Sequence, residues 1–107
     1  MDIPIRKAVL LLSLLLFLLL FLPLLSATDI SACNNLTTAG DTYVLTQSVT
    51  IAGAMCFNIS AQNITLNCNG YTLTGDNSSN SFGIYTNSYN VSIRNCNITN
   101  YDVGIYF

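Results

Sequence analysis

Apolar and polar residues alternate along most of the chain after residue 27. Apolar side chains stand at every second position of short segments, with Thr, Ser or Asn between them, as in "NITLNC" and "NVSIRNCNIT". A period of two is typical of half-buried β-strands, and nothing in this part of the sequence has helical periodicity. The pattern predicts an all-β protein with strands near residues 43–51, 57–59, 63–68, 71–74, 83–86, 91–98 and 104–106.

These strands recur along the chain. Residues 83–85 ("GIY") return at 104–106 after twenty-one residues, and residues 63–66 ("NITL") return at 90–93 as "NVSI" after twenty-seven. We assign the difference of six to the polar loop 75–81, "GDNSSNS", which the next repeat lacks. A period near twenty, built from short strands, predicts a solenoid whose equivalent strands stack in parallel about 4.8 Å apart.

The alternation also predicts which side chains face the interior. In the strand at 63–68, Ile64, Leu66 and Cys68 are expected to point inwards, and Thr65 and Asn67 outwards. One turn later, Val91 and Ile93 are expected to point inwards, and after a bend at Asn95 so are Cys96 and Ile98. A second inward stack is expected to hold Phe57 and Ile59, then Ile84 and Thr86, then Ile105.

Two long segments resemble a known family: "CFNISAQNITLNCNGYTLTG" and "GIYTNSYNVSIRNCNITNYDVGIYF". They resemble the right-handed parallel β-helix repeats of the pectin-lyase-like superfamily. More narrowly, they are similar to the repeats of periplasmic copper-binding NosD-type proteins and of secreted surface proteins. The resemblance covers about residues 43–107 and implies the right-handed β-helix fold. It implies no single function, because this superfamily includes lyases, hydrolases, adhesins and accessory proteins.

The first 27 residues are of a different kind. Arg6 and Lys7 precede an apolar run at 8–25, and the small residues Ser26 and Ala27 follow it. This order is typical of a secretory signal peptide, here cleaved after Ala27. The run is also long enough for an uncleaved N-terminal membrane anchor. Either way, the remaining chain is expected outside the cytoplasm, secreted or at the cell surface, with membrane contact only through the N-terminal segment.

The four cysteines suit an exported protein and allow three pairings. Cys68 and Cys96 fall within one position of each other on adjacent turns, which is within reach of a disulfide. Cys33 and Cys56 would then join the segment 28–55 to the first full turn. Two alternatives stay open: Cys68 and Cys96 as reduced core residues, or Cys33 as a lipidated N-terminus, because "ISAC" resembles a bacterial lipobox.

Six Asn-x-Ser/Thr sequons occur, at Asn35, Asn58, Asn63, Asn77, Asn90 and Asn97. Asn63 and Asn90 stand at the bend before a strand, where Asn tolerates the left-handed backbone and its amides can bond from turn to turn. We expect these two amides to be buried in such a ladder, which favours a structural role. Asn77, in the polar loop 75–81, is the glycosylation candidate.

Charged residues are rare beyond the leader. Residues 28–107 contain five, with no His, Trp, Lys or Glu: Asp29, Asp41, Asp76, Arg94 and Asp102. One arginine cannot neutralise a phosphate backbone, which excludes nucleic-acid binding. The aspartates are scattered singly, so the sequence offers no carboxylate pair for a lyase or hydrolase, and Asp41 and Asp102 are assigned to turns. Without His or a close Cys pair, we expect no zinc or copper site, no cofactor and no catalytic residue in this stretch.

The expected organisation is a leader at 1–27, an N-terminal cap at 28–55, and the first turns of a β-helix at 56–107. Because "VGIYF" ends inside a strand, the repeats predict an N-terminal fragment of a longer protein, truncated at its C-terminus and able to self-associate end to end.

The function expected from these features is that of an exported or cell-surface repeat protein with a structural, adhesive or carbohydrate-binding role. Its partners would be surface polysaccharide or other cell-envelope components, met by a face on which Tyr85 and Tyr106 recur. The alternative is the N-terminal part of a pectin-lyase-like carbohydrate-active enzyme whose catalytic turns lie outside this sequence.

Overall fold

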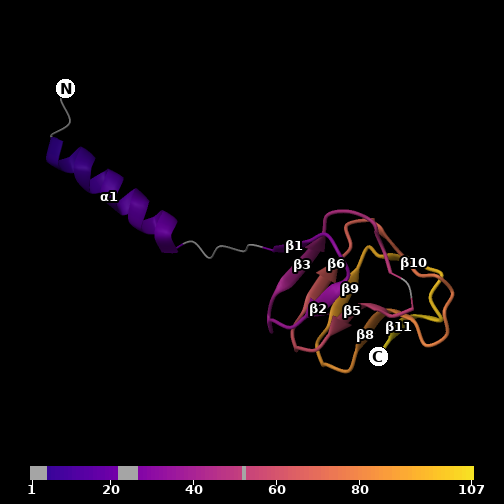
Figure 1. Cartoon of the computed structure of the whole chain (residues 1–107). Helices are drawn as coiled ribbons and strands as arrows, with labels where there is room; N and C mark the ends of the chain where they lie inside the picture. Colours follow the sequence, from indigo (N-terminus) through magenta and orange to yellow (C-terminus); the bar gives the residue numbers. More distant parts are fainter. Residues whose placement is uncertain (1–4, 22–26, 52) are drawn as a thin grey trace.

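The computed structural model describes residues 5–21, 27–51 and 53–107. A single helix, α1 (Ile5–Phe21), lies in the leader, and every regular element described after it is a strand (Figure 1). No helix in the described part of the chain is long and apolar enough to cross a membrane. The predicted signal or anchor run at 8–25 falls partly on residues 22–26, which lie outside the described residues.

Eleven short strands follow in the described ranges: β1 (Thr28–Ile30), β2 (Asn34–Leu36), β3 (Thr42–Leu45), β4 (Val49–Thr50), β5 (Met55–Ile59), β6 (Thr65–Asn67), β7 (Thr72–Thr74), β8 (Phe82–Thr86), β9 (Ser92–Arg94), β10 (Asn97–Thr99) and β11 (Val103–Tyr106). The predicted strands at 43–51 and 91–98 are each divided in two, the second at Asn95 as expected. β1 and β2 were not predicted, because their sequences, TDI and NNL, each contain one apolar residue and show no alternation.

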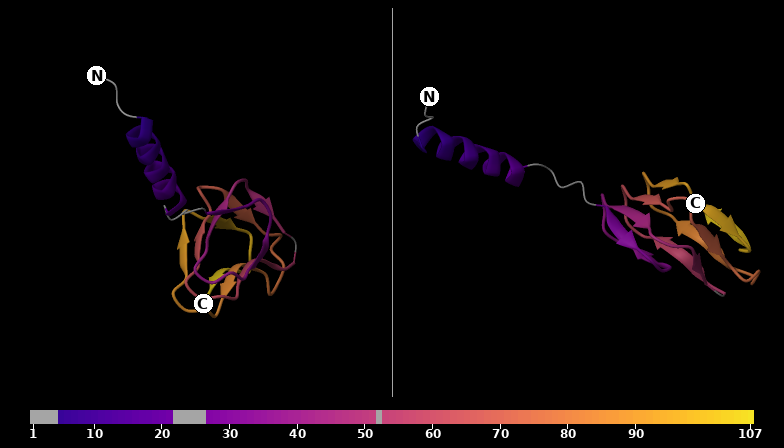
Figure 2. Two further views of the ribbon diagram at one scale, coloured as in Figure 1. Left: turned by 90° about the vertical axis from the view of Figure 1, so that its left-hand side faces the viewer. Right: turned by 90° about the horizontal axis from the view of Figure 1, so that it is seen from above.

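The strands form three parallel sheets. Sheet A has the order β1-β3-β6-β9, sheet B the order β2-β5-β8-β11, and sheet C the order β4-β7-β10. The chain visits sheets A, C and B in that order, so β3-β4-β5, β6-β7-β8 and β9-β10-β11 are three successive turns. Figure 2 shows the turns stacked along one axis. The predicted solenoid of parallel strands is therefore confirmed.

The register agrees with the two sequence repeats. Leu66 pairs with Ile93 across sheet A, and Ile84 pairs with Ile105 across sheet B. The assignment of all six extra residues to the loop 75–81 was wrong. That loop is four residues longer than its counterpart at 100–102, and the other two come from the corner between sheets A and C, where four residues separate β6 from β7 and two separate β9 from β10.

The core consists of side chains stacked in register from turn to turn. Ile64, Leu66 and Cys68 are fully buried, while Thr65 and Asn67 are only half-buried, so the in-out assignment of this turn is confirmed. The same stacking forms inward columns in every sheet: Tyr43, Leu66 and Ile93 in sheet A; Val49, Leu73 and Ile98 in sheet C; Phe57, Ile84 and Ile105 in sheet B. Sheet B has a second column of Leu36, Ile59 and Thr86, all fully buried.

Asparagine makes the corners of the solenoid. All seven described non-glycine residues with positive φ are asparagines: Asn63, Asn69, Asn77, Asn80, Asn90, Asn95 and Asn100. Asn tolerates this left-handed conformation better than most residues. At the corner between sheets B and A, the Asn90 side-chain amide donates to Oδ1 of Asn63 across 2.6 Å, which confirms the predicted ladder. The prediction that these two amides are buried was wrong, because the corner projects them into solvent.

Candidate functional site

An apolar and aromatic patch lies along sheet B. We call it the sheet B patch and define it as Met55, Phe82, Tyr85 and Tyr106. Ile84 and Thr86 are buried while Tyr85 between them is half-buried, so strand alternation turns Tyr85 to the outer face. Met55 is 40 % exposed and pairs in register with Phe82, and Tyr106 is 47 % exposed and pairs with Tyr85.

The three rings of the patch contact one another in two geometries. Tyr85 and Tyr106 are stacked, with ring centroids 5.2 Å apart and planes 4° from parallel. Phe82 meets Tyr85 edge-on at 5.7 Å, and meets Tyr106 at the same distance. Each such aromatic pair contributes about 0.5–1.5 kcal/mol beyond the area that it buries.

Stacking decides what the patch offers to a partner. The ring faces that Tyr85 and Tyr106 turn towards each other are covered by this stacking, so a partner can reach only the remaining parts of the two rings. None of the four side chains is charged, which suits the patch to neutral partners. The recurrence of Tyr85 and Tyr106 was predicted from the sequence. Phe82 was missed because it stands three residues from Tyr85, a spacing that alternation assigns to the opposite face.

The aspartates serve the backbone of the corners and loops. Asp41 Oδ1 accepts from the Thr42 N–H at 2.9 Å and its Oδ2 accepts from the Thr28 hydroxyl at 2.8 Å. Asp102 Oδ2 accepts from the Asn80 N–H at 3.0 Å. The turn role predicted for Asp41 is confirmed, and Asp102 also links its turn to the loop of the preceding one.

Asp76 holds the loop 75–81 to the turn before it. Its Oδ1 accepts from the N–H of Ser78 at 3.1 Å and from the N–H of Gly53 at 3.2 Å. Hydrogen bonds from Ser78, and then from Gly53, hold the pKa of the Asp76 carboxyl below its usual value. A carboxyl group that is ionised so readily is a poor proton donor, which weighs against a role as general acid.

We expect the loop 75–81 to be the first site of proteolysis, because Asp76, Asn77, Ser79 and Asn80 are all exposed. Replacing Asp76 with Asn removes the charged acceptor, so a broad-specificity protease should cut this loop several times faster in D76N at neutral pH. In the wild type the same protection should be present above the ordinary carboxyl pKa and lost as pH falls through the lowered pKa of Asp76.

The exposed Asp29, whose side chain makes no hydrogen bond to the described residues, provides the control variant D29N. First cleavage within 91–98, or equal rates for D76N and D29N, would contradict this account of the loop.

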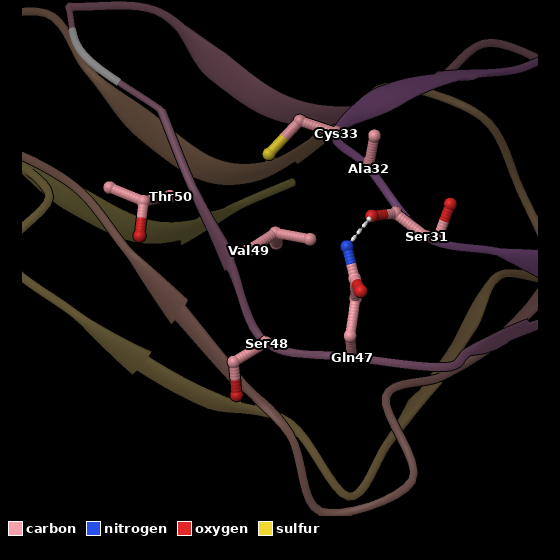
Figure 3. Close-up of a pocket in the computed structure, with 7 residues that line it drawn as sticks. All are labelled: Ser31, Ala32, Cys33, Gln47, Ser48, Val49 and Thr50. Atoms are coloured by element: carbon pink, nitrogen blue, oxygen red, sulfur yellow. Dashed lines mark hydrogen bonds between the residues drawn. The ribbon is translucent and has the colours of Figure 1, made fainter.

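A shallow hollow of about 200 Å³ opens beside β4, where the segment before the three full turns passes from β1 to β2 without a strand in sheet C (Figure 3). It is lined by Ser31, Ala32, Cys33, Gln47, Ser48, Val49 and Thr50. The Gln47 side-chain amide donates to the Ser31 carbonyl oxygen at 2.8 Å and spans one side of the hollow. The residues that line the hollow include no Asp, Glu, Lys, Arg or His, and Cys33 is disulfide-bonded.

The cysteines form two disulfides, Cys33–Cys56 and Cys68–Cys96, with Cα atoms 4.5 and 4.8 Å apart. The repeat register predicted Cys68–Cys96, and Cys33–Cys56 is the pair that was then expected for the other two cysteines. Each disulfide joins one turn to the next. The lipobox alternative requires a free thiol at Cys33 for lipid attachment, and this thiol is in a disulfide.

Asn77, the glycosylation candidate, is exposed in its loop, and its N–H donates to the Asn100 carbonyl oxygen. The described residues contain no group of three or more His, Cys, Asp or Glu side chains that could hold a metal ion.

No family model matches the chain, and neither a curated protein nor a solved structure matches it. The structure itself gives the class of protein: it is a parallel β-solenoid with two disulfides and an aromatic patch on one sheet.

Proposed function

We propose that this protein is an exported or cell-surface β-helix repeat protein with a structural or adhesive role. The observation that carries the proposal is the pair of disulfides, each of which joins two consecutive turns. Disulfides of this kind persist in oxidising compartments and are rare in the cytosol. The leader, with Arg6 and Lys7 ahead of its apolar run, supports the same location.

The finer assignment is to right-handed β-helices of the pectin-lyase-like superfamily, close to the NosD-type repeats. Parallel strands joined by a crossover are right-handed in nearly all proteins, which supports this handedness. The corner asparagines and the inward columns agree with the repeat pattern that carries the resemblance.

The sheet B patch is the proposed contact surface, and a neutral surface polysaccharide or another cell-envelope component is the proposed partner. Tyrosine combines a large apolar body with a hydroxyl group, so its exposed edge can contact a sugar and also bond to it. The enzyme alternative has no support from the aspartates, since Asp41, Asp76 and Asp102 each bond to backbone N–H groups.

The location is tested by producing the full chain with its leader in a secreting host. We expect residues 28–107 outside the cytoplasm, with no thiol free for alkylation until a reductant is added. The contact surface is tested by adsorption of the same material to insoluble cell-wall polysaccharide. We expect Tyr106→Ser to weaken adsorption and Tyr89→Ser to leave it unchanged, because Tyr89 is 68 % exposed but lies outside the patch.

A reduced, cytoplasmic chain would contradict the proposed location, whatever its adsorption. Adsorption that both tyrosine variants retain equally would contradict the proposed contact surface while leaving the location intact.

A further inference from the structure

The outer face of sheet B carries one continuous column of side chains. Asn35 pairs in register with Asn58, Asn58 with Tyr85, and Tyr85 with Tyr106 (Figure 1). Neighbouring members of the column are one strand spacing apart, about 4.8 Å. Asn58 lies on β5 and Tyr85 on β8, and each of these strands has a strand on either side. Because both asparagines belong to sequons, "NLT" and "NIS", the sheet B patch adjoins a position that can carry a sugar.

The structure separates the six sequons by what their side chains do. The Asn90 amide donates to Oδ1 of Asn63 across 2.6 Å, and the Asn97 amide donates to the Gly70 carbonyl oxygen across 3.1 Å. An N-linked sugar attaches to the side-chain nitrogen, which is already engaged at Asn90 and Asn97. The other three asparagines make no side-chain hydrogen bond to the described residues: Asn35, Asn58 and Asn77.

We propose that Asn58 is an N-glycosylation site whose first sugar packs against the ring of Tyr85. Phe57 and Ile59 are buried on either side of Asn58, so strand alternation turns the Asn58 side chain outwards, where the folded strand can keep a sugar. In the transfer, Nδ2 of Asn58 forms a bond with the anomeric carbon of a lipid-linked oligosaccharide. The bond from that carbon to the lipid phosphate breaks, the phosphate leaves with the electron pair, and Nδ2 releases one proton to solvent.

Tyr85 offers such a sugar one face of its ring. Tyr106 stacks on the opposite face, with the two planes 4° from parallel. Tyr106 and Asn58 stand on opposite sides of Tyr85 in the register, so the remaining face lies towards Asn58. Phe82 is 5.7 Å from both tyrosine rings, which places its centroid on the side of Tyr85 that faces Tyr106. An apolar C–H face of a neutral sugar ring can therefore pack on Tyr85 from the Asn58 side.

The inference rests on the exported location of the proposed function, because the transferring enzyme acts on exported chains. It does not use the adhesive role. A sugar on Asn58 would occupy one side of the sheet B patch and limit how far an external partner can reach Tyr85. It would also hold β5 and β8 together through a contact that the bare chain lacks, which gives the modification a measurable effect on stability.

The test uses the full chain with its leader, secreted from a eukaryotic host that N-glycosylates. A glycopeptide map should show a sugar on Asn58. Ser60→Ala removes the sequon and keeps Asn58, and it should lower the melting temperature by about 5 °C, the shift expected from one aromatic contact in a domain of this size. The same change should have its full effect beside Tyr85→Phe, which keeps the ring, and none beside Tyr85→Ser.

Two controls separate the sugar from the substitution. Thr37→Ala removes the sequon of Asn35, whose neighbour in the column is Asn58 and not a ring, and it should leave the melting temperature unchanged. In a bacterial periplasm without N-glycosylation, the wild type and Ser60→Ala should melt alike.

An exported chain with unmodified Asn58 would overturn the proposal and leave the proposed location intact. A glycosylated wild type that melts at the same temperature as Ser60→Ala would overturn the packing on Tyr85 in the same way, whether or not the Tyr85→Ser variant folds. A chain retained in the cytoplasm would overturn the proposed location as well.

Discussion

Leu66→Asp should abolish folding, whereas Thr65→Asp should leave the protein folded. Leu66 is fully buried at the centre of sheet A, stacked between Tyr43 and Ile93. An aspartate there is an unpaired charge in an apolar column, which costs several kcal/mol. Such a cost is comparable with the whole stability of a small domain, about 5–15 kcal/mol. Thr65 is half-buried on the outer face, where water can solvate the new carboxylate.

The structure adds a gradient to this expectation. Ile93 belongs to the same column but lies on the edge strand β9 and is only half-buried. Ile93→Asp should therefore be less damaging than Leu66→Asp, although more damaging than Ser92→Asp on the outer face. Far-ultraviolet circular dichroism and thermal melting of the four variants would measure the order. Equal damage at positions 65 and 66 would mean that the in-out register is shifted by one residue.

The inward columns were predictable because the same pattern of apolar positions recurs in successive repeats of the sequence. Strand alternation gives the face of Leu66, and the two repeats place Ile93 and Ile105 over their partners. The Cys68–Cys96 disulfide follows from the same register, because the repeats place these two cysteines side by side. Cys33–Cys56 was then the only pair left. Such contacts are easier to predict in a solenoid than in most folds, because each turn contacts mainly the turns next to it.

What the sequence did not predict depends on contacts between loops and on geometry at corners. β1 and β2 are strands because they pair with β3 and β5. Their own sequences show no alternation of apolar and polar residues from which a strand could be predicted. The bonds of Asp76 to Gly53 and Ser78 require the folded path of two loops from different turns. The position of the Phe82 ring in the sheet B patch likewise departs from strict alternation at the start of β8.

Tyr101 is a further residue whose place only the structure gives. A methyl group on Gly75 would stand 2.8 Å from the Tyr101 ring, and one on Gly83 would stand 3.3 Å from it, so both glycines leave room for this ring. The Tyr101 hydroxyl is buried without a hydrogen-bond partner among the described residues. Burial, with a smaller effect of the nearby Asp76 charge, raises the pKa of this phenol.

The repeated "GIY" segments provide the second large expected effect, since Gly83→Ala should be strongly destabilising and Gly104→Ala should not. A Cβ atom on Gly83 would stand 2.6 Å from the Gly104 carbonyl oxygen and 2.6 Å from Cγ2 of Ile98. Neither neighbour can withdraw cheaply, because one is the backbone of β11 and the other fills the inward column of sheet C. On Gly104 the nearest atom is the same Ile98 methyl at 3.7 Å, an ordinary contact.

Backbone conformation does not separate the two positions, because neither glycine has the positive φ that alanine resists. The difference is therefore steric. We expect Gly83→Ala to cost about 1–3 kcal/mol as overpacking and to lower the melting temperature by about 10 °C. Gly104→Ala should be neutral or slightly stabilising, since alanine reduces the entropy of the unfolded chain. Paired thermal melts of the two variants measure this contrast, and equal melting temperatures would show that β11 does not approach β8 as closely as the structure places it.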